Sequence, residues 1–361
     1  MTSARRPRSI RLRHGNRIMR PALALLVIAA WLCAAPARTQ TLVPEGRLSA
    51  NGDFAGKKGK AATDVSGLAC MPGPSGARRC LLINDEGSFA QFAQIAENRI
   101  TPGATLPILG EAASPAALGR PPGALCGAPG AFAELDGEAV AYADGAFYVA
   151  GSHGCSRRKG EFRLSSFHLA RVRVDGAGAP ATGVELSYRL GDMLRRAGPA
   201  APYFGKRLME ENGLNIEGIA VVGDRLWAGL RAPSLDGRAF LVGASLSALF
   251  APGTEPATAA PVVVACPVGR GRGIRDLAAL SDGRLLMLVG PAQEQDLPYE
   301  LLLLDPARPD AATSLGTLRG VRDGKAETVT LLSEAPGRIE ILIGYDGRRN
   351  GDFERYRLRT P

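Results

Sequence analysis

The apolar positions of this chain fall into short runs that come in pairs, and a Gly- or Asp-containing turn joins the members of each pair. In the clearest pair, Glu217 opens the first run, Gly223 begins the turn, and the second run extends from Leu226 to Leu230. Two β-rich runs joined by such a turn predict a β-hairpin. Arg231 follows the second run directly, so this hairpin carries a charge on each strand at its open end.

The same hairpin recurs in diverged form along the chain. Five copies are visible, and they begin near Val65, Leu135, Leu214, Ile274 and Lys325. Repetition of a β unit at this scale is typical of radial arrays such as propellers. We therefore predict an all-β fold, with a single closed β-propeller domain of five or six blades over residues 38–361.

Two segments depart from this pattern. Residues 190–209 place Leu190, Met193 and Leu194 at helical spacing, which predicts a short helical insertion between repeats. Residues 38–60 are polar and rich in glycine, and we expect a solvated lead-in there. The alternative is that this lead-in supplies the strand that completes the last blade, because few residues remain after Glu327 to build a long one.

The first 37 residues carry most of the net charge and are not expected to belong to the fold. Seven arginines and no acid precede residue 21, an apolar run follows, and Ala35-Pro36-Ala37 matches a small-residue cleavage site. This layout predicts a signal peptide over residues 1–37 and a periplasmic or secreted protein with no stable membrane span after cleavage. An uncleaved anchor is the alternative, although the run is short for a bilayer. Without this segment the formal net charge falls from +9 to +2, so no nucleic-acid partner is expected.

Export would permit disulfides among the five cysteines that remain. Cys70 and Cys80 flank a Pro/Gly-rich turn between two predicted strands, and we expect them to pair. Cys126 and Cys155 border the second hairpin and form the second candidate pair, which leaves Cys266 over. No Cys-x-x-Cys occurs, so zinc ribbons and thioredoxin-type redox motifs are disfavoured.

The hairpin register also predicts one cluster of polar side chains near the axis. The start of the first strand of an antiparallel hairpin lies beside the end of the second, and radial repetition brings these edges together. The residues concerned open or close the hairpins, and Arg275 joins them by adjacency: Asp85, Glu138, His153, Glu217, Arg231, Arg275, Asp276, Glu327 and Asp346.

Converging carboxylates cannot all stay ionised unless a cation binds or arginines neutralise them. In the first hypothesis the cluster binds a hard ion, Ca²⁺ in the first place, and forms a metal-assisted hydrolase of an anionic ester, phosphoesters first. Its oxygen ligands would be Asp85, Glu138, Glu217, Asp276, Glu327 and Asp346. Arg231 and Arg275 would grip a small anionic ligand, and His153 and Glu217 would be the catalytic groups.

In the second hypothesis the acids and arginines pair with one another and lock the blades. The protein is then a non-catalytic propeller, expected to be monomeric, that binds a ligand or a protein partner. His153 would be a structural hydrogen-bonding residue. The sequence leaves both hypotheses open.

The repeated phrases resemble a family of unknown function known as domain of unknown function 3616. The similarity covers most of the chain after about Val65, and the segment from Asn215 to Pro233 is its most specific part. Glu327 departs from the family pattern, because Thr328 follows it where the family usually has Gly. The family is similar to phytase-like and other six-bladed propellers, so the resemblance implies a propeller and no established activity.

Overall fold

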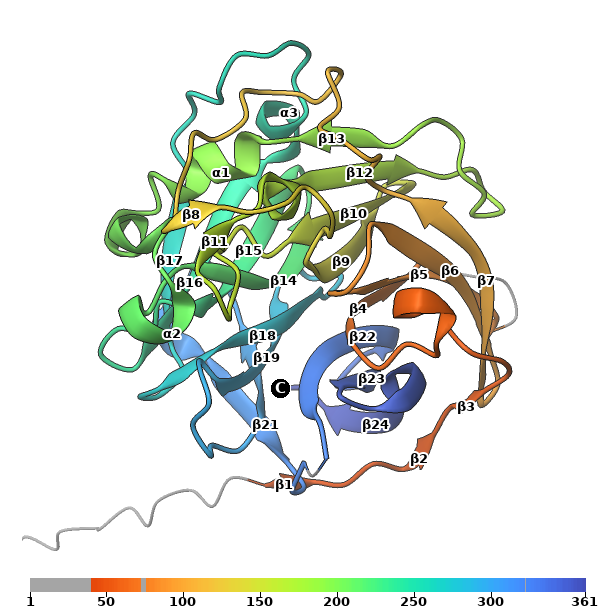
Figure 1. Ribbon diagram of the computed structural model, residues 1–361. Helices are drawn as coiled ribbons and strands as arrows, with labels where there is room; N and C mark the ends of the chain where they lie inside the picture. Colours follow the sequence, from red (N-terminus) through yellow and green to blue (C-terminus); the bar gives the residue numbers. More distant parts are fainter. Residues whose placement is uncertain (1–39, 73–75, 322) are drawn as a thin grey trace, which may run out of the picture. The chain divides into compact units, whose positions relative to one another are not determined.

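Each of the five repeated hairpins is extended by further strands into one blade of a five-bladed propeller arrangement (Figure 1). The computed structural model describes residues 40–361 apart from 73–75 and 322, so the predicted signal peptide lies outside the described residues. The all-β class is confirmed. The five sheets fall within the predicted range of blade number, whereas the six blades implied by the phytase-like resemblance are not found among the described residues.

The five blades follow one another in chain order. Their strands are β4 (Val65–Cys70), β5 (Arg78–Asn84), β6 (Phe89–Ala96) and β7 (Arg99–Pro107); β9 (Gly137–Ala143), β10 (Ala146–Gly151), β12 (Leu169–Arg173) and β13 (Glu185–Ser187); β14 (Asn215–Val222), β15 (Arg225–Ala232), β16 (Arg238–Ser245) and β17 (Val262–Pro267); β18 (Arg272–Ala279), β19 (Leu285–Pro291), β20 (Glu300–Leu304) and β21 (Thr313–Leu318); and β22 (Lys325–Ala335), β23 (Arg338–Asp346) and β24 (Glu354–Arg359).

The first strand of every blade is the innermost one, and these inner strands pack against one another. β4 contacts β9, β9 contacts β14, β14 contacts β18, β18 contacts β22, and β22 contacts β4 (Figure 1). The hydrophobic core is correspondingly divided into five clusters that lie between neighbouring blades. One of them joins Leu332 and Leu342 of the fifth blade to Leu68 and Leu82 of the first. Successive strand residues point to opposite faces, so each blade supplies apolar side chains to both of its neighbours.

The N-terminal segment is not a solvated lead-in, and the alternative expectation describes it better. Three short strands extend three blades at their outer edges. β1 (Thr41–Leu42) runs parallel to β21, β2 (Gly46–Arg47) is antiparallel to β24, and β3 (Ser49–Ala50) is parallel to β7. Leu42, Leu48 and Phe54 are buried, which explains why this glycine-rich stretch is held in place. β2 therefore completes the last blade, which has only three strands of its own.

The predicted helical insertion is present and minor. It consists of α1 (Arg189–Leu194), the 3-10 turn Gly198–Tyr203 and α2 (Leu208–Glu211). The remaining elements of the described chain are small: α3 (Leu246–Leu249), the strand pair β8 (Ala128–Pro129) and β11 (Glu161–Phe162), and the 3-10 turns Lys57–Gly59, Leu164–Phe167, Pro309–Ala311 and Arg349–Gly351. No helix in the described part of the chain has the length and apolar character needed to cross a membrane.

Candidate functional site

Each inner strand contains a β-bulge near its beginning, and the five bulges occupy equivalent positions. In every case the ladder to the second strand skips one residue of the inner strand. The skipped residues are Ser66, Glu138, Glu217, Arg275 and Glu327, and we call them the bulge ring. A bulge inserts an extra residue and re-aims its side chain. The bulge ring is therefore the set of side chains that the repeats bring together at one end of the inner strands.

The sequence register is off by one residue in the fourth blade. Arg275 occupies the bulge position, whereas the prediction aligned Asp276 with Glu138 and Glu217. The Asp276 carboxylate instead accepts hydrogen bonds from the backbone N–H groups of Leu277, at 2.8 Å, and of Val329, at 2.7 Å. Asp276 thus links the inner strands of two blades and has both oxygens engaged.

The members of the bulge ring from the third, fourth and fifth blades form one ion-pair network. Arg275 Nε lies 2.9 Å from Glu217 Oε2, and Arg275 Nη2 pairs with Glu327 Oε1. Arg231, at the end of β15, adds a contact of 2.5 Å to Glu217 Oε1 and donates from Nε to the Ala292 carbonyl at 2.8 Å. The Glu217 and Arg275 side chains are only 3% and 1% exposed. Two carboxylates and two guanidinium groups balance in charge, so this network matches the interblade lock of the second hypothesis.

Opposing effects of burial and of neighbouring charges determine the pKa of Glu327. Burial raises the pKa of Glu327 to about 7, and Glu217 and Asp346 add to that rise, while Arg275 opposes it. Burial lowers the pKa of the Arg275 guanidinium, but the attraction of Glu217 and Glu327 outweighs it and the pKa ends above its ordinary value. The Glu327 carboxylate therefore depends on Arg275 to remain charged in a buried site.

Two acids of the cluster, Glu138 in the bulge ring and Asp85, have no such partner among the described residues. Glu138 is half-buried and makes no hydrogen bond or ion pair with any described residue, and burial together with Glu217 raises its pKa well above the ordinary value. Burial, then Asp136 and Asp64, raise the pKa of Asp85 to about 8. The Oδ1 atom of Asp85 is buried without a hydrogen-bond partner. These two carboxyl groups are the acids of the cluster that have no cationic partner among the described residues.

The last predicted metal ligand, Asp346, pairs with Lys325 at 3.1 Å. Of the six predicted ligands, Glu217 and Glu327 are therefore held by arginines, Asp276 by backbone, and Asp346 by a lysine. Across the described residues, no group of three or more His, Cys, Asp or Glu side chains is arranged to hold a metal ion. The Ca²⁺ site stays a prediction. Of its six predicted ligands, Glu138 and Asp85 are the two that have neither a cationic nor a backbone partner for the carboxylate among the described residues.

His153, the predicted catalytic base, is fully buried and lies against the Phe167 ring at a centroid distance of 5.8 Å. Its Nδ1 lies 2.9 Å from the Gly151 carbonyl, and its Nε2 has no partner. His168 repeats this arrangement with the Ser165 carbonyl. Burial lowers the pKa of each imidazole to about 4. No described hydrogen bond or ion pair joins His153 to the bulge ring, so its placement fits the structural alternative.

The two predicted disulfides are confirmed. Cys70 and Cys80 are direct cross-strand neighbours with Cα atoms 3.9 Å apart, and Cys126 is bonded to Cys155. Cys266 is buried and free.

The second disulfide anchors a basic loop whose Arg157 pairs with Glu294. Burial and the nearby Arg231 lower the pKa of Arg157, so this loop lies within electrostatic reach of the network. Arg157 is not among the site residues predicted from the sequence.

One protein-family model matches part of the chain. A model described as "Protein of unknown function (DUF3616)" matches residues 189–352. Over this segment the chain is similar to the DUF3616 family. The matched segment contains Glu217, Arg231, Arg275 and Glu327, which are the whole ion-pair network. Glu138 and Asp85, the two uncompensated acids, lie outside it.

Comparisons beyond the DUF3616 family give no activity. Curated proteins yield no match. Among solved structures, the mannose phosphorylase MPT-4 of Leishmania mexicana is similar over 90% of this chain and 88% of its own, at 15% identity and a TM-score of 0.43. An exo-β-1,3-galactanase of Clostridium thermocellum is similar over 89% of this chain and 62% of its own, at 9% identity and a TM-score of 0.45. A protein of unknown function from Dyadobacter fermentans is similar over 89% of this chain and 99% of its own, at 10% identity and a TM-score of 0.45. Similarity at these levels assigns no activity to the chain.

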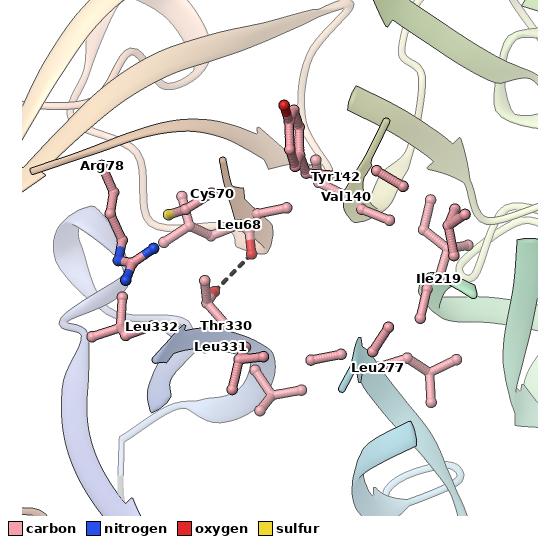
Figure 2. A pocket seen from close by; sticks show the side chains of 18 of the residues that line it. Leu68, Cys70, Arg78, Val140, Tyr142, Ile219, Leu277, Thr330, Leu331 and Leu332 are labelled. Carbon is pink, nitrogen blue, oxygen red and sulfur yellow. Dashed lines mark hydrogen bonds between the residues drawn. The ribbon is translucent and has the colours of Figure 1, made fainter. Parts of the chain in front are cut away.

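The opposite end of the same inner strands encloses a pocket of about 540 Å³ (Figure 2). Every blade contributes apolar side chains to it: Leu68, Val140, Ile219, Leu277 and Val329. Thr330 Oγ1, which also faces it, donates to the Leu68 carbonyl at 2.6 Å. The space exists because small residues stand beside these positions in four of the five inner strands, namely Ala69, Ala141, Ala220 and Ala278. This pocket was not predicted from the sequence, although the alanines in equivalent registers were the available signal.

Proposed function

We propose that this protein is a non-catalytic, ligand-binding propeller whose pocket between the five inner strands holds the apolar body of a small molecule. The observation that carries the proposal is the pocket itself. Its 540 Å³ lie within the range of about 300–1,000 Å³ that is usual for small-molecule sites. Its walls come from all five blades, which makes it a preformed concavity on rigid strands.

The charged end of the inner strands supports binding over hydrolysis. A metal-assisted hydrolase needs an ion with an open coordination position that faces a concave site. Here Glu217 and Glu327 are held by Arg275, and Glu217 is also held by Arg231. These groups act as an electrostatic clamp between blades, which keeps the pocket walls at fixed separation.

Binding of a neutral apolar probe tests the proposal. We expect N-phenyl-1-naphthylamine to show saturable fluorescence enhancement with one site per chain. Ala278→Leu should weaken this binding at least about tenfold, because the added side-chain carbons occupy the pocket. Ala116→Leu, in a separate surface hollow of 260 Å³, is the matched control and should leave binding unchanged. Equal binding by wild type and Ala278→Leu, with unchanged melting temperatures, would contradict the proposal.

A metal-dependent function remains the second candidate, favoured by one specific observation. Glu138 and Asp85 are the acids of the cluster without a cationic partner, and their raised pKa values are what two carboxyl groups show when a counter-cation is lacking. We expect Ca²⁺, if it binds, to release protons from these groups and to lower both pKa values.

Calorimetric titration with Ca²⁺ at pH 7.5 checks this candidate. In that case Glu138→Gln should abolish the binding heat and leave the melting temperature without Ca²⁺ unchanged, because Glu138 makes no described hydrogen bond or ion pair that the neutral isostere would lose. Glu217→Gln is the informative comparison, since it should lower stability through the loss of a partner for Arg231 and Arg275. No binding heat with the wild type would remove the metal-assisted hydrolase from consideration.

The cellular compartment of the protein and the closing of the propeller ring are also part of what we propose. Two disulfides support residence in an oxidising compartment, and we propose export to the periplasm or the exterior. The contacts of β22 with β4, and the core cluster shared by the last and first blades, support a closed ring. Mass spectrometry of the mature N-terminus in a cell-envelope fraction checks export, and an intact chain in the cytoplasm would contradict it.

A further inference from the structure

The rim of the pocket carries a cation without a counter-charge. Arg78 begins β5 and is the one Lys or Arg among the described residues that line the pocket. Its guanidinium group extends toward Leu332 of the fifth blade (Figure 2). Every Asp and Glu of the chain lies in the described residues, and none of them forms an ion pair with Arg78. The Arg78 side chain also makes no described hydrogen bond.

The acid at the same rim, Glu334, already accepts a hydrogen bond from the backbone. Glu334 lines the pocket, and its Oε2 accepts a hydrogen bond from the backbone N–H of Ser281 at 2.8 Å. No ion pair joins it to Arg78. Arg78 thus stands at the mouth of a cavity whose inner walls are apolar, with no acid of the described chain within ion-pair distance of it.

We propose that the pocket selects an amphipathic anion, with its apolar body between the inner strands and its head group on Arg78. This inference rests on the proposed function and adds the class of ligand. A carboxylate accepts two parallel N–H donors from one guanidinium group, which fixes its orientation as well as its charge. The pairing at the rim is partly desolvated by the apolar walls, so it is stronger than an ion pair in open water. The ligand class is a carboxylate with a chain or ring body of moderate size.

A matched ligand series tests the charge preference. Decanoate, decanol and decyltrimethylammonium share one apolar chain and differ in the head group, and their affinities can be measured calorimetrically on the full chain at low and high salt. We expect wild type to bind decanoate about tenfold more tightly than decanol and decyltrimethylammonium most weakly. Added salt should reduce the preference for decanoate, because screening weakens an ion pair at a partly exposed rim.

Variants of β5 separate Arg78 from general surface charge. Arg78→Gln should reduce decanoate affinity to that of decanol and leave decanol unchanged. Arg78→Lys should give an intermediate affinity, since it keeps the charge and loses the two-pronged geometry. Arg79→Gln is the control on the same strand: Arg79 is exposed, does not line the pocket and lies over the Phe92 ring. It should retain the tenfold preference.

The outcomes distinguish this inference from the function on which it rests. Equal binding of all three ligands by wild type, or a decanoate preference that survives Arg78→Gln, overturns the anionic ligand class and leaves the ligand-binding propeller intact. Failure of wild type to bind any of the three, or N-phenyl-1-naphthylamine, overturns the proposed function itself. If Arg78→Gln does not fold, the Arg78→Lys variant and the salt dependence of the wild type decide the matter.

Discussion

Replacing Arg275 with Met should cost this protein about 3–5 kcal/mol of unfolding free energy at neutral pH. Arg275 is 1% exposed and pairs with Glu217 of the preceding blade and with Glu327 of the following one. Its removal leaves two buried carboxylates with one remaining guanidinium group, that of Arg231, which pairs with Glu217. An uncompensated buried charge is among the largest destabilising changes that a single substitution can produce.

The loss should depend on pH in a defined direction. The pKa of Glu327 is already about 7 with Arg275 present, and removal of the opposing cation raises it further. A carboxyl whose pKa is raised in the folded state contributes stability at low pH that disappears as pH rises through the folded pKa. Arg275→Met should therefore be less damaging at pH 5.5 than at pH 8.5. Urea unfolding at the two pH values measures the difference.

Arg284→Met is the matched control in the same blade. Arg284 pairs with Asp282 at 2.7 Å, but its side chain is 27% exposed and that of Asp282 is 44% exposed. Exposed pairs contribute about 0–1 kcal/mol, so this variant should lose less than about 1 kcal/mol at either pH. Similar losses for Arg275→Met and Arg284→Met would show that the bulge-ring network is not an interblade lock.

The second large effect concerns the two buried histidines. The pKa of His153 and of His168 is lowered by burial from 6.5 to about 4. The unfolded chain therefore binds more protons than the folded chain between these values, and stability is lost as pH falls from about 6.5 to about 4. A shift of this size corresponds to about 3 kcal/mol for each imidazole at pH 4.

The measurement compares wild type with His153→Asn by denaturant unfolding from pH 7.5 to pH 4. The variant is less stable at pH 7.5, because a well-packed ring is lost, and its deficit should shrink by about 3 kcal/mol as pH falls. Acids with raised pKa values, such as Asp85, are present in both proteins and cancel in the difference. Phe240→Leu, which removes a buried ring that has no described contact with either histidine ring, is the control, and its deficit should not change with pH.

The local features of this protein were predictable from its sequence. The paired apolar runs predict the hairpins, because a Gly- or Asp-containing turn between two β-rich runs favours antiparallel pairing of those runs. The pairing of Cys70 with Cys80 followed from the same register, since both cysteines stand across one turn. The convergence of Glu217 and Arg231 followed from their places at the start and end of one hairpin.

The identity of the residues at the axis was decided by tertiary structure. Side chains alternate along a strand with a period of two, so one inserted residue changes which side chain faces the axis. A bulge placed Arg275 in the ring and turned Asp276 toward the backbone, and no sequence pattern marked that bulge. The pairing partners of the acids depended on this choice, because Arg275 bridges Glu217 and Glu327.

The number of blades and the pocket were decided in the same way. Strand pairing between segments distant in sequence, such as β2 with β24, depends on which outer edges remain open after the blades assemble. The pocket depends on what five separate strands leave unfilled. Alanine in one inner strand predicts only a small side chain, whereas alanines at matching heights in four neighbouring strands produce a cavity. The chain specifies each strand locally, and only packing around the axis determines the space that the strands enclose.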